Sequence, residues 1–478
     1  MAIPDEIIEF FKGEMGHTML VKGEPGTGKT IFALTLLKEL YGTNNGIYLS
    51  TRVDNTKLYA DFPWISKVIP PKHIIDATQS EFEPVSTREN MDMDYFINTL
   101  KYSDRPTFLG NIYRMCDEFE VAVVVIDSWD AVLTQTGEVE NREDLESLIT
   151  DISSKASIDF ILVSEYTYQD KLDYLVDSVI TMKAEEIGGR AVRTLNINKL
   201  RGVRREHPAY LFSLEGGVFS SLKPFEFKYP SEHKRFEPIK DTPSYFSSGS
   251  EDLDDMLGGG YPLGSFVFLD IGADVAQDAF MNVLMQTVAN FIHQENPVIM
   301  FPPGEVSPKG MKANAYLYGF EDRLNELMKF VEFTYLPDGD GFESEKYICS
   351  IEPGNLMDDV AKWRKLWNRL QEETGNPVLN TVGFDVFDYI YTNKDELLKL
   401  MSILARCTDD ASSLTIAIGR DSTEEINRYL ADISDMHLKL EALSGSIVIY
   451  GIKPRTELYY MSLDVSAGYP KVKLNPIV

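Results

Sequence analysis

One stretch near the start of the chain has the residue types and the spacing of a phosphate-binding loop. Residues 23–30 read Gly-Glu-Pro-Gly-Thr-Gly-Lys-Thr and fit the pattern G-x-x-x-x-G-K-[ST]. The glycines let successive backbone N–H groups point at phosphate oxygens, at the positive end of a following helix. The lysine is predicted to reach the β- and γ-phosphates of ATP, and the last threonine to ligate Mg²⁺. The predicted loop residues are Gly23, Glu24, Pro25, Gly26, Thr27, Gly28, Lys29 and Thr30.

The flanking segments supply the context that this loop requires. Residues 17–21 form an apolar stretch that reads as a strand, and apolar residues recur at helical spacing from Ile31 to Leu40 until Gly42. The alternative is a chance glycine-rich loop. The order strand, loop, helix favours the phosphate-binding interpretation.

A carboxylate that completes such a site ends a second strand. Residues 121–126 (VAVVVI) predict a buried strand, and Asp127 follows it directly. An aspartate just beyond a buried strand can orient Mg²⁺. The alternative role is an ordinary strand-end turn, and the intact loop upstream favours the metal role.

Elements of the first half alternate between strands and helices. Strands are expected at 46–51, 121–126, 160–164, 176–184 and 192–199, and helices at 93–102 and 108–119. Gly188 and Gly189 turn the last two strands into a hairpin. This pattern predicts an α/β fold with a mainly parallel sheet, flanked by helices and extended by an antiparallel hairpin.

The second half repeats this plan. Strands are expected at 266–271, 298–301, 330–336 and 380–384, the last ending at Asp385, with a helix at 276–293. A Lys-x-Arg tripeptide recurs at 199–201 and 453–455, and between them residues 223–243 are rich in proline and charge. We therefore expect two tandem domains, 1–222 and 244–478, joined by an extended linker at 223–243.

The second copy has lost the chemistry of its loop. Residues 272–279 read Gly-Ala-Asp-Val-Ala-Gln-Asp-Ala, so aligning Gly272 with Gly23 puts Gln277 at the last glycine, Asp278 at the lysine and Ala279 at the threonine. A carboxylate in place of the lysine would repel phosphate. The second domain is expected not to bind ATP in the usual way and to act as a structural or partner-binding pseudo-domain.

Composition limits the remaining choices. The formal net charge is −29, from 46 Lys and Arg against 75 Asp and Glu, which opposes broad contact with nucleic acid. The three cysteines are scattered, no apolar run approaches a membrane span, and the N-terminus has no signal-peptide pattern. A cytoplasmic protein with no membrane contact and no structural transition metal is expected.

These motifs together resemble one known family. The loop, the strand ending in Asp127, the Lys-x-Arg hairpin and the leader LDDMLGGGYPLGS at 253–265 are similar to the KaiC-like branch of the RecA superfamily in its double-domain form. Within it, GEPGTGKT and YLSTRVD at 48–54 resemble the archaeal gas-vesicle regulatory protein D group. The resemblance covers nearly the whole chain and implies two RecA-like domains. It also implies self-association, commonly as a ring or hexamer, with ATP between neighbouring subunits.

Two positively charged residues of this chain match a motif of the family. The resemblance implies that Lys199 and Arg201 form a finger that reaches the γ-phosphate of an adjacent subunit. The alternative is a pair of surface cations on a hairpin. Lys453 and Arg455 stand at the equivalent place of the second domain, where they are either vestigial or complete a first-domain site.

One expected residue is missing. In this family the strand after the first helix normally ends in a glutamate that activates water, but here the sequence continues as Ser-Thr-Arg52-Val-Asp54. Asp54 and Glu165 are the candidate substitutes. Slow hydrolysis is therefore expected, and the autokinase activity of the family is unsupported because it belongs to a second domain with a working loop.

Three functions fit these observations. The first is a weak ATPase that acts as a nucleotide-dependent regulatory or assembly switch on a protein partner, with transcription regulation implied only by the narrower resemblance. The second is a DNA-acting recombinase or repair ATPase, which the acidity opposes. The third is a non-hydrolysing scaffold in which ATP joins subunits.

Overall fold

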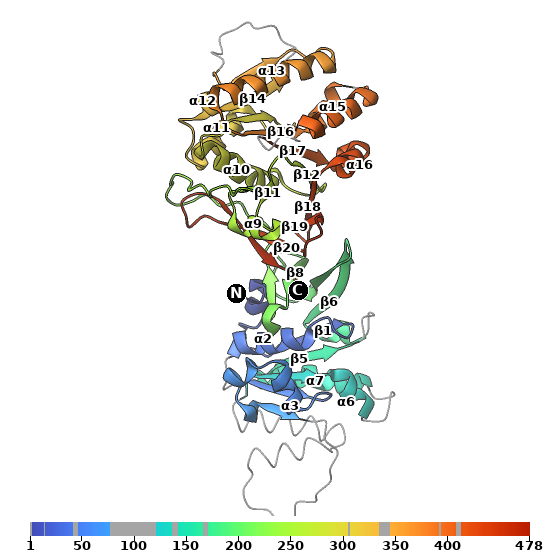
Figure 1. Ribbon diagram of the computed structural model, residues 1–478. Coiled ribbons are helices and arrows are strands. Elements are labelled where there is room, and N and C mark those ends of the chain that lie inside the picture. The colour runs from blue at the N-terminus through green and yellow to red at the C-terminus, as the bar shows by residue number, and fades with distance from the viewer. Residues whose placement is uncertain are drawn as a thin grey trace, which may run out of the picture. The chain divides into compact units, whose positions relative to one another are not determined.

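The computed structural model describes residues 2–13, 15–41, 46–76, 121–135, 142–165, 171–304, 306–333, 345–391, 393–407 and 413–478. The chain divides into two compact units, Met1–Lys223 with Ile477–Val478, and Pro224–Pro476. Each unit is a sheet flanked by helices (Figure 1). The helices expected at 93–102 and 108–119 lie outside the described residues.

The sheet of the first unit has nine strands among the described residues, in the order β3-β2-β4-β5-β1-β6-β7-β8-β9. Strands β3 to β6 of this order run parallel, and β7, β8 and β9 extend the sheet antiparallel, as the alternating pattern predicted. The strands are β1 (Thr18–Gly23), β2 (Gly46–Ser50), β3 (Ile74–Asp76), β4 (Val123–Asp127), β5 (Asp159–Ser164), β6 (Ser178–Ile187), β7 (Arg190–Leu200), β8 (Ala209–Ser213) and β9 (Ser220–Leu222). The helices are α1 (Asp5–Phe10), α2 (Lys29–Tyr41), α3 (Asn55–Asp61), α6 (Trp129–Gln135), α7 (Arg142–Ala156) and α8 (Lys171–Leu175).

The central strand β1 is buried on both faces, which explains its continuous apolar sequence. Met19 and Val21 pack with Phe32 of α2 in one hydrophobic layer. Leu20, which points the other way, packs with Trp129 of α6 in the opposite layer. Helices therefore pack on both faces of β1, and the loop that follows it lies at the carboxyl edge of the sheet.

The sheet of the second unit has ten strands within the described ranges, in the order β15-β14-β13-β16-β17-β12-β18-β19-β20-β21. Strands β15 to β18 of this order run parallel, and β19 to β21 extend the sheet antiparallel. The strands are β12 (Phe266–Ile271), β13 (Val298–Phe301), β14 (Met328–Phe333), β15 (Ile348–Ile351), β16 (Val378–Gly383), β17 (Ser413–Arg420), β18 (Met436–Leu443), β19 (Ser446–Lys453), β20 (Tyr459–Asp464) and β21 (Lys471–Pro476), with β10 (Tyr245–Phe246) and β11 (Tyr261–Pro262) forming a separate pair.

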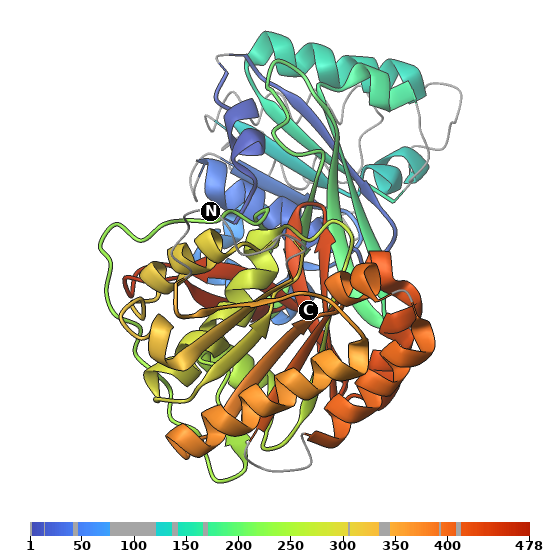
Figure 2. The ribbon, with the colours of Figure 1, turned by 90° about the horizontal axis from the view of Figure 1, so that it is seen from above.

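Two sets of helices cover the two faces of this sheet (Figure 2). Helices α9 (Glu251–Leu257), α10 (Gln277–His293), α11 (Pro308–Leu317) and α12 (Leu324–Leu327) contribute to one hydrophobic layer. Helices α13 (Leu356–Thr374), α14 (Phe384–Ile390), α15 (Lys394–Cys407) and α16 (Glu424–Ile433) contribute to the other. Both units thus have the mainly parallel, doubly covered sheet that the sequence predicted.

The proline-rich segment before β10 carries no helix or strand and packs against the second unit. Phe236 is buried in the core of that unit. The N–H of Ile239 donates to the side-chain oxygen of Asn290 on α10 over 2.8 Å. The segment is therefore an extended chain held in place by the second unit.

Candidate functional site

The glycine-rich loop lies between β1 and α2, at the carboxyl edge of the first sheet. Gly26 and Gly28 have positive φ angles of 83° and 95°, which side chains other than glycine adopt only with strain. Thr27 closes the loop on itself, because its hydroxyl donates to the carbonyl of Glu24 over 2.8 Å. A Cβ at Gly26 would meet no atom within 4 Å, so the loop is open to a ligand on that side.

Lys29, at the first position of α2, is folded over this loop. Its ammonium donates to the carbonyls of Gly23 and Glu24 over 2.7 and 2.8 Å, and the residue is 7% exposed. Burial lowers the pKa of Lys29, while the carboxylates of Glu165 and Asp127 act in the opposite direction. A buried ammonium satisfied by carbonyls places a positive charge in the loop.

Thr30 and Asp127 meet beside this lysine, as expected if they share a cation. The hydroxyl of Thr30 donates to Oδ2 of Asp127 over 2.6 Å. The buried phenol of Tyr48, on β2, donates to the same oxygen over 2.5 Å. Burial, the charge of Asp127 and this hydrogen bond raise the pKa of Tyr48 well above its usual value, so it remains a donor.

The candidate substitutes for the missing glutamate have different surroundings. Asp54 is the N-cap of α3 and accepts a 3.0 Å hydrogen bond from the N–H of Lys57. Glu165, just after β5, forms an ion pair with Arg52. Of the two, Glu165 acts electrostatically on Lys29. The charge of Glu165 thus acts on the loop lysine, while its carboxylate is already paired with the arginine that stands in place of the expected glutamate.

The hairpin cations make contacts that do not involve the loop. The Lys199 ammonium donates to the carbonyls of Asp173 and Tyr174, at the end of α8, over 3.0 and 3.1 Å, and also to the carbonyl of Val176. Burial lowers its pKa. Arg201 is 63% exposed and pairs with Asp177 over 2.8 Å. Within the chain, therefore, Lys199 supports the end of α8.

The second unit repeats the lysine contact, although residues 272–279 lack the lysine and the threonine of the first loop. Lys453 donates to the carbonyl of Ser434 over 2.5 Å. Ser434 precedes Asp435, whose carboxylate accepts from the N–H of Phe266 over 2.8 Å, just as Asp177 accepts from Thr18 over 3.1 Å in the first unit. Because the contact is kept in a unit whose loop sequence differs, we assign it a role in the fold. The intersubunit role of Lys199 and Arg201 remains a prediction.

The hydrogen bond that Asp177 accepts from Thr18, and Asp435 from Phe266, also shows how the sequences of the two units align. With Thr18 matching Phe266, α2 and α10 both begin eleven residues later, at Lys29 and Gln277. Gln277 therefore stands at the lysine and Asp278 at the threonine. The sequence alignment on Gly272 was wrong by one residue, because the strand before the loop, not the glycine, sets the register.

The strand-end aspartate of the second unit was also placed wrongly. Asp127 pairs with Val163 on β5, and the equivalent pair in the second unit is Gly383 with Ile418 on β17. Asp385 lies two residues further on, in α14, and accepts a hydrogen bond from the N–H of Gly304 over 3.0 Å. A Cβ at Gly383 would lie 2.6 Å from the backbone of Pro303, so a side chain does not fit there.

Two residues of the site were missed by the sequence analysis. Tyr48 reads as one more apolar position of β2, and only the strand order places it beside Asp127. Asp130 on α6 is buried and accepts from the hydroxyl of Ser164 and the N–H of Glu165 over 3.0 and 2.6 Å. Burial raises the pKa of Asp130. The sequence could have indicated Asp130, because it lies three residues after Asp127 and therefore on the same strand-to-helix turn.

Comparisons with known proteins agree with this geometry. Residues 7–198 match the family described as GvpD gas vesicle protein, P-loop domain, and residues 235–319 match GvpD basic region 2. Protein GvpD2 of Halobacterium salinarum is 29% identical across 99% of this chain and 96% of its own length. Protein GvpD1 of the same organism is 27% identical over the same shares. The chain is thus similar to GvpD proteins over nearly its whole length.

More distant relatives connect the GvpD family to a wider group. The circadian clock oscillator protein KaiC of Prochlorococcus marinus is 24% identical over 70% of this chain and 64% of its own length. The family resemblance seen in the sequence, to the KaiC-like branch of the RecA superfamily, is confirmed. The loop at Lys29 therefore belongs to a P-loop protein, a class that binds nucleotides.

The name "basic region 2" does not describe the composition of this chain. The segment matching basic region 2, residues 235–319, contains four Lys and Arg against eleven Asp and Glu. It is therefore acidic and offers no concentration of cations for nucleic-acid phosphates. No helix in the described ranges is both long and apolar enough to span a bilayer.

Proposed function

We propose that this chain is a slow ATPase of the GvpD family that works as a nucleotide-dependent switch on a protein partner in gas-vesicle regulation. One Mg²⁺–ATP would bind in the first unit and none in the second. The observation that carries the proposal is the convergence of Lys29, Thr30 and Asp127 on one loop at the carboxyl edge of the first sheet. We place the protein in the cytoplasm.

The residues of the loop fit Mg²⁺–ATP. The two glycines with positive φ turn the backbone, the space beside Gly26 is open, and Lys29 supplies a cation to the loop. The oxygens of Thr30 and Asp127 are 2.6 Å apart, and hard oxygen donors are what Mg²⁺ prefers. When bound, Mg²⁺ would neutralise charge on the phosphates. The protein's part is to hold these donors ready.

The surroundings support slow turnover. No carboxylate follows β2 directly, Asp54 is occupied as a helix cap, and Glu165 is paired with Arg52. A free base beside the loop would be needed to activate water efficiently. Slow hydrolysis suits a switch, because the ATP-bound state then lasts long enough to engage a partner.

Self-association is part of the proposal. The family's intersubunit finger would bring Lys199 and Arg201 of one copy to the nucleotide of another, in a ring or hexamer. Arg201 is exposed and its side chain forms an ion pair with Asp177, so it can be redirected at small cost. Nucleic acid is not the expected partner, because the net charge is −29 and the region named basic is acidic here.

Native mass spectrometry with and without Mg²⁺–ATP tests the proposal, because it counts nucleotides and subunits together. We expect one nucleotide per chain, and ATP-dependent assembly. Lys29→Ala should weaken ATP binding by about 100-fold, since charged hydrogen bonds to phosphate are lost. Lys38→Ala, which removes a lysine from the same helix, is the matched control and should bind normally.

Each other outcome has a definite meaning. Unchanged ATP affinity in Lys29→Ala would refute the site. Two nucleotides per chain would refute the inactive second unit. A monomer that binds one ATP would remove the intersubunit role of Lys199 and Arg201, and binding without phosphate release would leave a non-hydrolysing scaffold.

A further inference from the structure

An ion pair between Arg52 and Glu165 bridges the end of the strand that carries Asp127. The strands lie in the order β2-β4-β5-β1 at this part of the sheet. Arg52 follows β2 and Glu165 follows β5, so the pair passes over the carboxyl end of β4, next to the strand that leads into the loop. Two side chains of opposite charge therefore meet beside the positions of Lys29 and Asp127.

The backbone of Glu165 is fixed, and the charges of both partners act on Lys29. The N–H of Glu165 donates to the buried carboxylate of Asp130 over 2.6 Å, which fixes the backbone from which Glu165 extends. The charges of Glu165 and Arg52 influence Lys29 in opposite senses, the first raising and the second lowering its pKa. The pair is thus within electrostatic reach of the lysine that faces the phosphates.

The arginine of this ion pair can change its partner from a carboxylate to a phosphate. The side chains of Arg52 and Glu165 are 43% and 35% exposed, and ion pairs with such exposure are weak. A guanidinium binds phosphate through two parallel hydrogen bonds, and a terminal phosphate carries more charge than one carboxylate. A phosphate that arrives beside Lys29 can therefore compete for the arginine.

We propose that Arg52 distinguishes ATP from ADP by leaving Glu165 for the terminal phosphate of ATP bound in the same subunit. Glu165 is the resting partner of Arg52, and hydrolysis must wait until a bound triphosphate has displaced this partner and released the carboxylate. Arg52 is thus a specificity-determining residue supplied in cis. This inference rests on the proposed function, because it requires a nucleotide in the Lys29 loop.

The two partners should then have opposite effects on binding, which a purely structural ion pair would not give. Arg52→Gln should weaken the non-hydrolysable triphosphate AMP-PNP by about 10-fold while ADP changes by less than about 2-fold. Glu165→Gln should tighten AMP-PNP by about 2- to 5-fold, because no ion pair must first be broken. Titration calorimetry of the full chain with Mg²⁺ measures all four affinities without hydrolysis.

Lys155→Gln is the matched control. It also removes one member of an exposed ion pair, with Asp151 on α7, but α7 leads into the opposite end of β5. It should leave both affinities unchanged. If Arg52→Gln does not fold, Arg52→Lys keeps the charge without the fork and should lose part of the preference for AMP-PNP.

The outcomes separate this inference from the proposed function. If the wild-type chain binds neither nucleotide, the proposed function fails and this inference fails with it. If the wild type binds both but Arg52→Gln keeps its AMP-PNP to ADP ratio, or both substitutions weaken AMP-PNP, only the inference is overturned.

Discussion

Asp127 accepts two hydrogen bonds on one oxygen, from Thr30 and from Tyr48, and these donors differ in what they can do. The Thr30 hydroxyl is only partly buried at the start of α2 and can turn to a cation. The Tyr48 phenol is buried and stays protonated, so it fixes the carboxylate whether or not a cation is present. Tyr48 is therefore a positioning residue for Asp127.

Tyr48→Phe should lower the free energy of unfolding of the first unit by about 1–3 kcal/mol, because a charged carboxylate loses a buried donor. Tyr59→Phe is the matched control. No partner for the buried Tyr59 hydroxyl is found in the described part of the chain, and its removal should cost little. Urea unfolding of both variants at neutral pH measures the difference. Equal losses would show that the Asp127 contact contributes nothing.

How much of this site the sequence could reveal depended on how local each signal was. The loop and Asp127 follow from continuous motifs, and the structure brings Lys29, Thr30 and Asp127 together. Tyr48 lies 79 positions from Asp127, and Arg52 meets Glu165 only through the strand order. Such contacts depend on topology, which a single sequence does not specify.

At the scale of elements, the short helix α8 is anchored from two sides. Lys22 on β1 forms an ion pair with Asp173 over 2.7 Å, and both side chains are largely buried. Lys199 on β7 donates to the last carbonyls of the same helix. Cations at a helix C-terminus satisfy carbonyls that have no partner within the helix. Thus α8 connects the strand before the loop to the hairpin.

Lys199→Ala should therefore lower the free energy of unfolding of the first unit by about 1–2 kcal/mol. Arg201→Ala removes only an exposed ion pair and should cost less than about 1 kcal/mol. Thermal unfolding distinguishes the two. Because Arg201→Ala should remain stable, a loss of turnover in that variant would report the intersubunit role without a folding defect. Equal destabilisation would contradict the assignment of Lys199 to α8.

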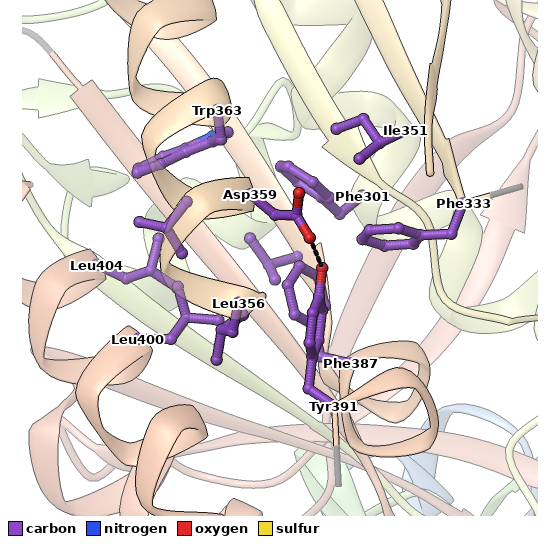
Figure 3. Close-up of a pocket in the computed structure, with 12 residues that line it drawn as sticks. Phe301, Phe333, Ile351, Leu356, Asp359, Trp363, Phe387, Tyr391, Leu400 and Leu404 are labelled. Carbon is purple, nitrogen blue, oxygen red and sulfur yellow. Dashed lines mark hydrogen bonds between the residues drawn. The ribbon is translucent and has the colours of Figure 1, made fainter. Parts of the chain in front are cut away.

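A carboxylate in the second unit gives its stability a dependence on pH. Asp359 on α13 lines a cavity of about 20 Å³, room for about one water, among the aromatic side chains in Figure 3. It accepts from the Tyr391 hydroxyl over 2.9 Å, Lys362 over 2.7 Å and the Gly354 N–H over 2.9 Å. Burial alone would raise the pKa of Asp359, but these bonds outweigh it and hold the pKa below its usual value.

The sign of the effect follows from this lowered pKa. The contribution of Asp359 is fully present above its unfolded pKa of about 4, and is lost as pH falls below that value through the lower folded pKa. In Asp359→Asn the second unit should be less stable at pH 7, and its stability should fall less on going to pH 3. Urea unfolding at both pH values measures this. An equal fall in wild type and variant would contradict it.

The sequence predicted the elements better than their ends. The doubly covered parallel sheets follow from β-branched strands that alternate with helices, and both are confirmed. The strand expected at 380–384 instead runs from Val378 to Gly383, and Phe384 begins α14. Apolar residues continue across this boundary, so hydrophobicity alone could not locate it. Because the sequence misplaces this boundary, it predicts Asp385 as the residue of the second unit that is equivalent to Asp127.

At the scale of the whole molecule, the two units share one fold but differ in the residues at the end of the sheet where the loop lies. The first keeps Lys29, Thr30 and Asp127, while the equivalent positions of the second hold Gln277, Asp278 and Gly383. All three phosphate- and cation-binding groups are thus replaced together. The second unit keeps the sheet and the lysine of its hairpin, which are the parts that the fold itself needs.

Restoring the lysine and the hydroxyl alone should not restore the second site. Gln277→Lys with Asp278→Thr returns these two groups, but the carboxylate that would hold Mg²⁺ is still missing at Gly383. Asp274 and Ala276 also still stand where the first loop has Gly26 and Gly28. We expect this double variant to bind one nucleotide per chain, as the wild type does. Native mass spectrometry with Mg²⁺–ATP counts them, and a second bound nucleotide would show that Gly383 does not matter.

The close approach of Pro303 to Gly383 has a historical consequence. A Cβ at residue 383 would lie 2.6 Å from the nitrogen and the Cα of Pro303. Regaining an aspartate there would therefore require the neighbouring proline segment to change first. Neither step alone would benefit the second unit, because that unit lacks a lysine in its loop. The loss of the second site is in this sense one-way. Homologues with a carboxylate at this position should also lack the proline, which their sequences can show.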